Sequence, residues 1–468
     1  MIHPVRARPT LPRSAPAVAL GLLLAGCALA PEAGQPPGAE APTTRAAPRP
    51  RVPLPPMKRF GPYRPQPVTL SNTDIARDFL DLSFSLESGR PLPWMSRFNG
   101  PVTLTLRGPV PATAPRDLDA LLARLRTEAH IPIHRTDGAA NITVEFLPRA
   151  QMQALAPQAA CFVAPSVSSW AEFRRARGSA GAHWAALDQR RQLAVFIPSD
   201  TSPQEVRDCL NEEIAQALGP LDDLYRLTDS VFDDDNFQNV LTGFDMLMLR
   251  LYYAPELPSG TTRAEAAQRL PALLARINPR GQTIAPRPAP GATPRAWISA
   301  VEAALGAQSG EARRRAAAQR AVAIAQSEGW QDARMAFSLF VLGRIERVDD
   351  PEAALQALRA ARALYARLPD TAVQRAHVDM QLAAYALAAE QPDRALKLID
   401  SARPVAERAQ NAALLATLLL MRSDALMMQG QRAAARAARL DSIGWARYGF
   451  GTERAILQRM KQIASLSD

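Results

Sequence analysis

The chain has 468 residues, of which 47% are hydrophobic and 21% are charged, and its formal net charge is +10 at pH 7. This composition excludes wholesale disorder, and three cysteines with five histidines are too few for a zinc-finger array or a scaffold of many disulfides. The basic excess lies mainly in residues 1–68, whereas residues 201–256 are acidic, so we expect no nucleic-acid partner. No apolar run approaches the roughly 20 residues of a membrane-spanning helix, so we expect no integral membrane protein.

The N-terminus has the pattern of an export signal. Basic residues precede an apolar stretch at 15–25, which has the length of a signal-peptide core. The stretch ends in Leu24-Ala25-Gly26-Cys27, which resembles the lipobox of bacterial lipoproteins. The resemblance implies cleavage after Gly26 and lipid on Cys27, which would anchor the protein to a membrane. Because residue 28 is Ala rather than Asp, analogy with lipoprotein sorting favours the outer membrane, facing the periplasm. The alternative is an ordinary secretory signal.

Proline-rich stretches divide the chain. Residues 27–68 are rich in proline, cannot bury enough apolar surface to fold and should form an extended spacer, and the proline-rich residues 279–295 are expected to be a second linker. We therefore expect five parts, namely a signal peptide at 1–26, a disordered tether at 27–68, a folded domain at 69–278, a linker at 279–295 and a helical-repeat domain at 296–468.

The domain at 69–278 contains segments with helical patterns and segments with strand patterns of apolar residues. Apolar residues at three- and four-residue steps predict helices at 72–88 and 117–128, and alternation predicts a strand at 102–106. Further strands are expected at 142–146 and at 193–197, the second ended by Pro198. Strands separated by helices at this spacing favour a small mixed sheet, so we expect an α+β domain.

Two cysteines remain if Cys27 carries lipid. Cys161 and Cys209 form an even pair, and an exported protein folds in an oxidising compartment, so we expect a disulfide between them. The alternative is two buried free thiols.

The most informative helix is expected at 203–218. Ser202-Pro203-Gln204-Glu205 predicts a capping box with proline at the first helical position, and Gly219 marks the end. The end of this helix is similar to the zinc-peptidase pattern H-E-x-x-H-x-x-G-x-x-H/D. Glu213 then takes the catalytic-glutamate position, Gly219 that of the turn glycine and Asp222 that of the third ligand, while Glu212 and Gln216 replace the two histidines. Zinc sites of this class need both neutral imidazoles, so we expect no metal, no cofactor and no catalytic residue.

The residues after this helix extend the resemblance. Ser230-Val231-Phe232-Asp233 resembles the methionine turn of metzincins, with Phe232 in place of the methionine, and Thr242 to Asp245 predicts the cap of another helix. The stretch from about 70 to 275 resembles an uncharacterised family of proteobacterial lipoproteins with a degenerate zincin-like domain, for which no activity is established.

The acidic residues of this region admit other interpretations. Glu213 falls near the apolar side of its helix, where burial would raise its pKa. A hard-cation site could use Glu212, Glu213, Asp222 and Asp223, or Asp233 to Asn236, although neither spacing matches an EF-hand. The simpler interpretation is a solvated acidic rim. The isolated His183 and His377 are expected to be packed or solvated.

Residues 296–468 repeat a helical pattern. Small residues recur at intervals of 41 and 39 residues, as Gly343, Ala384 and Ser423 in a first helix and Ala354, Ala395 and Ala434 in a second. Turns are expected at 350–352, 391–393 and 430–432. The pattern resembles tetratricopeptide repeats, although the interval exceeds 34 and the usual Trp and Tyr positions are not matched. The alternative is a non-repetitive, alanine-rich bundle.

Together these patterns predict a lipid-anchored cell-envelope protein that acts as a non-catalytic pseudo-peptidase and helical-repeat binding module. Its partners would be the membrane, through Cys27, and envelope proteins or peptides, through the repeats. One alternative is a zinc- or other metal-dependent hydrolase with an unconventional site at Glu212, Glu213, Gln216 and Asp222. Another is a passive assembly scaffold.

Overall fold

The computed structural model describes residues 55–464, except for 158, 180–182, 234, 236 and 307–308. The expected signal peptide, Cys27 and residues 27–54 of the tether therefore lie outside the described residues. The later elements belong to one compact unit, Leu54–Asp468. Along the part of the chain that is described, no helix has the length and apolar character needed to cross a bilayer.

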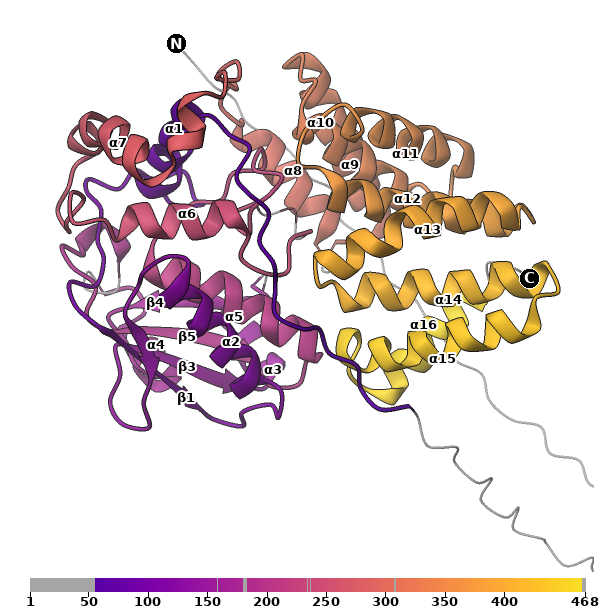
Figure 1. Ribbon diagram of the computed structural model, residues 1–468, viewed down its shortest axis with the longest axis horizontal. Helices are drawn as coiled ribbons and strands as arrows, with labels where there is room; N and C mark the ends of the chain where they lie inside the picture. The colour runs from indigo at the N-terminus through magenta and orange to yellow at the C-terminus, as the bar shows by residue number, and fades with distance from the viewer. Residues whose placement is uncertain are drawn as a thin grey trace, which may run out of the picture. The chain divides into compact units, whose positions relative to one another are not determined.

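A five-stranded mixed sheet forms the centre of the N-terminal domain, in the order β2-β1-β3-β5-β4 (Figure 1). Strands β1 (Val102–Arg107), β3 (Ile142–Leu147) and β5 (Leu193–Pro198) lie in parallel at the positions predicted from the sequence. The sequence analysis missed both edge strands, the parallel β2 (Ile133–Arg135) and the antiparallel β4 (Phe162–Pro165), because three or four residues are too few to show a period. The sheet and its helices confirm the α+β class.

Among the described residues, helices α1 to α7 and two short 3-10 turns accompany this sheet. The predicted first helix ends five residues early, because residues 84–91 form a tight turn in which Gly89 has a φ of 75°. Leu86 N–H donates to Arg90 C=O across that turn at 3.0 Å. The elements are α1 (Asn72–Ser83), α2 (Ala114–Thr127), α3 (Arg149–Gln153), α4 (Trp170–Ala176), η2 (Trp184–Ala186), α5 (Pro203–Leu218), α6 (Gly243–Tyr252), α7 (Arg263–Ile277) and η3 (Pro279–Gln282).

Helix α5 has the predicted bounds. Ser202 Oγ accepts a hydrogen bond from Glu205 N–H at 3.1 Å, but the Glu205 carboxylate bonds Arg149 and Thr201, so only half of the predicted capping box forms. The box at Thr242 and Asp245 is complete. Gly219 ends α5 with a φ of −146°, which is not a left-handed backbone conformation. Glycine is instead favoured by packing, because a Cβ at this position would lie 3.0 Å from Leu249.

Residues 295–464 form antiparallel helical pairs in which neighbouring helices pack together. The pairs at α10/α11, α12/α13 and α14/α15 turn where the sequence predicts, and α8 with α9 adds a further pair. A Cβ at Gly343 would lie 2.6 Å from Leu358 Cγ, so the small residue permits close approach of α10 and α11. The helices are α8 (Arg295–Leu305), α9 (Glu311–Ser327), α10 (Ala333–Ile345), α11 (Pro351–Tyr365), α12 (Ala372–Ala388), α13 (Pro392–Arg408), α14 (Ala412–Met428), α15 (Arg432–Gly449) and α16 (Glu453–Ala464).

Residues 55–68 differ from the expected disordered tether. They form an extended strap that runs beside α15 toward the N-terminal domain (Figure 1). Lys58 N–H donates to Gly444 C=O at 2.9 Å, and Phe60 stacks on Trp445 with ring centroids 4.4 Å apart. The prolines keep this segment extended, as predicted, but the aromatic residues between them supply contacts that hold it.

The linker at 279–295 is also packed against folded elements. Arg287 N–H donates to both carboxylate oxygens of Asp74, at 3.2 and 3.1 Å, and Gly291 C=O accepts from the buried Arg334 at 2.9 Å. The predicted linker between α7 and α8 is therefore held in place by these hydrogen bonds.

Candidate functional site

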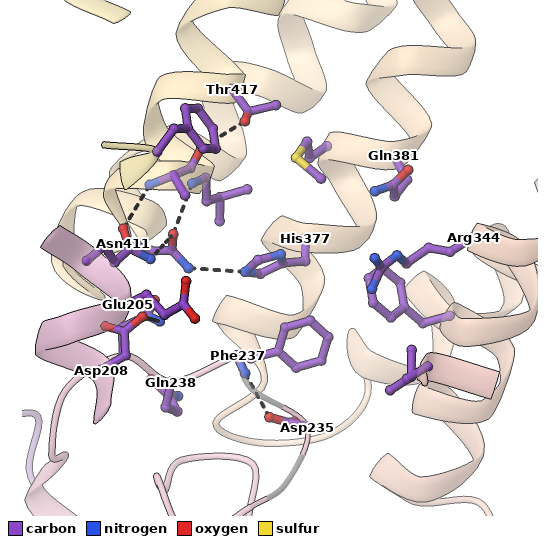
Figure 2. A pocket seen from close by; sticks show the side chains of 18 of the residues that line it. Glu205, Asp208, Asp235, Phe237, Gln238, Arg344, His377, Gln381, Asn411 and Thr417 are labelled. Atoms are coloured by element: carbon purple, nitrogen blue, oxygen red, sulfur yellow. Dashed lines mark hydrogen bonds between the residues drawn. The ribbon is translucent and has the colours of Figure 1, made fainter. Parts of the chain in front are cut away.

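A cavity of about 860 Å³ opens between α5 with the loop at 231–239 and the first helices of three pairs, α10, α12 and α14 (Figure 2). Helix α16 contributes a further part of its wall. The volume falls within the roughly 300–1,000 Å³ of ligand-binding pockets. Aromatic and sulfur-containing side chains supply much of the apolar lining, namely Phe237, Phe337, Phe340, Phe450, Met380 and Met421.

One side of the cavity is acidic. Glu205, Asp208 and Glu212 from α5, with Asp235 from the loop, make up this acidic wall. Burial raises the pKa of Asp208 to about 7, although the neighbouring Arg207 acts in the opposite direction. Asn239 Nδ2 donates to Asp208 Oδ2 at 2.8 Å and holds the carboxyl in place.

Three arginines also line the cavity, and Figure 2 shows one of them, Arg344, across from Glu205 and Asp208. Arg344 and Arg347 near the end of α10, with Arg459 of α16, make up this basic wall. Burial lowers the pKa of both Arg344 and Arg459, and repulsion from neighbouring arginines lowers each further. Arg344 lies 5.4 Å from the Phe340 ring centroid, and Arg459 Nε and Nη2 lie 3.4 Å from Thr417 Oγ1. Within the described residues, no carboxylate lies within 4.0 Å of any of the three guanidinium groups.

His377 lies between the two walls (Figure 2). Its Nε2 is 3.4 Å from Asn411 Nδ2, while Asn411 Oδ1 accepts from Leu414 N–H at 2.9 Å as the cap of α14. That cap fixes the amide, so Asn411 Nδ2 donates to Nε2 and the ring proton resides on Nδ1. Burial, with the nearby Arg344, lowers the pKa of His377 to about 3, so the ring is neutral at physiological pH.

The residues of the peptidase-like pattern do not all meet in this cavity. Glu212 lines it, but Glu213, Gln216 and Asp222 do not. Gln216 Nε2 lies 3.4 Å from Glu87 Oε1 and 3.5 Å from Asp223 Oδ2, and Asp222 accepts a hydrogen bond from Ser85. The pattern is therefore divided between two faces of α5.

Glu213 is buried, as expected, with 4% of its surface exposed. Burial raises the pKa of its carboxyl well above the ordinary value, and Glu212 and Glu87 raise it further, while a hydrogen bond from the Val163 backbone in β4 opposes them. The carboxyl therefore holds its proton to a higher pH than an exposed glutamate would.

No group of three or more His, Cys, Asp or Glu side chains that could hold a metal ion occurs in residues 55–464 outside the gaps. This finding includes Glu212, Glu213, Asp222 and Asp223. Of the second cation hypothesis, Asp234 and Asn236 lie outside the described residues.

The predicted disulfide is confirmed. Cys161 and Cys209 are bonded, with Cα atoms 6.0 Å apart, and join the segment before β4 to α5. Both residues also line the cavity. The bridge therefore fixes α5 relative to the edge of the sheet.

Arg190 anchors the other end of α5 and was not singled out in the sequence. It is 1% exposed, and its Nη1 and Nη2 donate to the carbonyls of Gln216 and Gly219, each at 2.6 Å. These bonds satisfy carbonyls that the helix end leaves unpaired. The Trp184 ring lies 5.1 Å from the guanidinium and covers it.

The described fold is thus an α+β domain followed by tetratricopeptide-like helical pairs. Residues 72–272 match the family described as "Protein of unknown function (DUF2927)", so the α+β part is a domain of an uncharacterised family, as the sequence resemblance implies. No curated protein and no solved structure gives a significant match to the chain.

Glu213 gives this region a testable pH dependence. Because its folded-state pKa lies above 4.5, the folded protein keeps a proton that the unfolded chain releases, and stability falls as pH rises from about 4.5 through the raised pKa. Glu213→Gln removes this loss. We expect its melting temperature to exceed that of the wild type by a few degrees at pH 8, with the difference shrinking toward pH 4.5.

Calorimetry from pH 4 to 8 measures this difference, with Glu407→Gln, on the exposed side of α13, as the matched control. A difference between Glu213→Gln and wild type that is constant over this range would contradict a raised folded-state pKa.

Proposed function

We propose that this protein is a non-catalytic peptide-binding lipoprotein of the cell envelope, anchored through lipid on Cys27. Its degenerate zincin-like domain and its helical pairs together form one binding site. The cavity between α5 and the first helices of the pairs is the observation that carries this proposal.

The lining of the cavity suits a peptide. Apolar side chains can receive peptide side chains, and a few placed polar groups can fix the peptide backbone, which is the usual composition of a specific pocket. Gln381 on α12 and Thr417 on α14 reach the cavity from neighbouring pairs (Figure 2). Asn239 adds a further amide from the loop of the α+β domain.

The chemistry of α5 supports binding without hydrolysis. A zinc peptidase polarises its substrate with a metal held by neutral imidazoles, and Glu212 and Gln216 stand at those positions. The glutamate that would act as base, Glu213, is buried and lies outside the cavity lining. The proposed activity is therefore retention of a peptide, not its cleavage.

Site-specific photo-crosslinking tests the proposal. The purified full-length protein would carry a photoreactive amino acid at Gln381, in the cavity, or at Gln356, on the exposed side of α11, as the matched control. After irradiation with a mixture of random peptides, we expect intact peptides attached at position 381 and few at position 356. Equal labelling at both positions would contradict a binding site in the cavity.

The same samples address the metallohydrolase alternative. Elemental analysis would measure bound metal, and mass spectrometry would show whether the peptides are cut. Stoichiometric zinc together with chelator-sensitive cleavage would replace the binding proposal with a hydrolase.

A further inference from the structure

We propose that the basic wall, Arg344, Arg347 and Arg459, binds a peptide carboxylate, so that the ligand of the cavity is an acidic peptide or a peptide with a free C-terminus. This inference rests on the proposed peptide-binding function and deepens it.

The first support is the missing counter-ion. Three guanidinium groups face one cavity from α16 and from the end of α10. None has a carboxylate within 4.0 Å among the residues that the structure describes. By contrast, the neighbouring Arg315 pairs with Glu346 at 3.1 Å and also with Asp349. Carboxylates are therefore available close to α10, yet the cavity-facing arginines do not use them.

The second support is that three positive charges line one cavity: Arg459 is half-buried, while the side chains of Arg344 and Arg347 still reach solvent. Burial and mutual repulsion both lower the pKa of Arg344 and Arg459, so the free protein carries an unfavourable concentration of positive charge. A bound anion would relieve that repulsion. A guanidinium bonds a carboxylate through two parallel N–H donors, which makes arginine the most suitable residue for this task.

The side chains are also positioned before any ligand arrives. The Phe340 ring supports Arg344, and the Phe450 ring centroid lies 6.0 Å from the Arg459 guanidinium. Thr417 holds Arg459 from the side of α14. Less side-chain freedom is then lost on binding, which favours affinity.

The acidic wall determines which anion fits. Glu205, Asp208, Glu212 and Asp235 line the same space. Glu205 is paired with Arg149, and the pKa of Asp208 is raised to about 7, so the negative charge that would repel a nucleotide or another polyanion comes mainly from Glu212 and Asp235. His377 adds no positive charge, because its pKa is lowered to about 3. A ligand with one carboxylate and an apolar body can pair with the arginines and pack against the phenylalanines. Such a ligand brings no second negative charge close to the acidic wall.

Equilibrium dialysis of the full-length protein against three peptide mixtures tests this site. All three consist of N-acetylated hexapeptides randomised among alanine, leucine and phenylalanine. The first mixture has a free C-terminus, and the second has a C-terminal amide. The third also has a C-terminal amide but carries one glutamate within the peptide. Mass spectrometry measures the retained fraction. We expect the wild type to retain the free-carboxylate peptides at least tenfold better than the plain amides.

Substitution identifies the residues responsible. Arg344→Gln and Arg459→Gln should each reduce that preference to twofold or less, whereas Arg359→Gln, exposed on α11, should retain it. Unchanged thermal unfolding would show that the variants are folded. If the amidated glutamate peptides bind as well as the free-carboxylate peptides, the arginines accept the carboxylate of an acidic side chain. If they bind as weakly as the plain amides, the arginines select the C-terminal carboxylate.

The two proposals fail differently. Equal binding of all three mixtures to wild type and variants would overturn the carboxylate site while leaving peptide binding intact. No binding of any mixture would contradict the peptide-binding function itself. Displacement of the peptides by micromolar inorganic phosphate would overturn the assignment to a carboxylate.

Discussion

Arg190→Met should destabilise the protein by about 3 kcal/mol, because the substitution removes the donors to Gln216 and Gly219 but leaves both carbonyls buried. Hydrogen bonds from a charged donor contribute roughly 1.5–3 kcal/mol each, and an orphaned buried acceptor adds its own desolvation penalty. Methionine fills part of the volume, so the effect reflects the lost bonds more than a cavity. Urea unfolding followed by circular dichroism measures the change, and hydrogen exchange should accelerate at the end of α5.

Arg191→Met is the matched control for this prediction. Arg191 follows Arg190 directly in the chain, but its side chain is exposed. The free energy of unfolding of the Arg191→Met variant should therefore differ from that of the wild type by no more than about 0.5 kcal/mol. Equal midpoints for the two variants would show that Arg190 does not anchor α5.

Removing the disulfide should have an effect of similar size. Cys161 and Cys209 are 48 residues apart in sequence, and closing a loop of that length stabilises a fold by about 4 kcal/mol in the chain-entropy model. We expect the paired variant Cys161→Ala, Cys209→Ala to lose about that much stability under oxidising conditions, measured as a shift in the urea midpoint. The bridge ties α5 to the edge of the sheet, so the cavity wall should loosen as well.

Reduction supplies the control for the disulfide. Dithiothreitol should lower the midpoint of the wild type to that of the paired variant and should leave the variant itself unchanged. A wild-type midpoint that does not respond to complete reduction would contradict a stabilising role for the bridge.

The parts of the fold that were predictable from sequence are those with strong local periodicity. Strands β1 and β3 alternate between apolar and polar residues, β5 is a short apolar run that ends in proline, and α5 has a capping serine, a proline and a terminal glycine. The helical pairs were predicted because close packing needs small side chains such as Gly343. The edge strands β2 and β4 are too short to carry such a signal, and the turn at Gly89 interrupts an apolar pattern that otherwise continues.

The site was less predictable because it depends on contacts between distant segments. The sequence analysis selected Glu212, Glu213 and Gln216 as a group, but the rotation of α5 places Glu212 in the cavity and the other two outside its lining. His377 is isolated in sequence, and only the folded chain brings Asn411 to its Nε2 atom. Local pattern identified the correct helix without indicating which of its faces borders the cavity.

The strap at residues 55–68 has a mechanical consequence. Lys58 pairs with Asp441, Arg447 donates to Pro55 C=O at 2.8 Å, and Gln410 donates to Gly61 C=O at 2.8 Å. A pull on the chain from its N-terminal side would therefore load α15 and the neighbouring helix ends before it reached α1. The helical pairs would bear the tension first, and part of it would then pass to the α+β domain, since Phe60 lies against Arg207 of α5 and Tyr63 against Arg124 of α2.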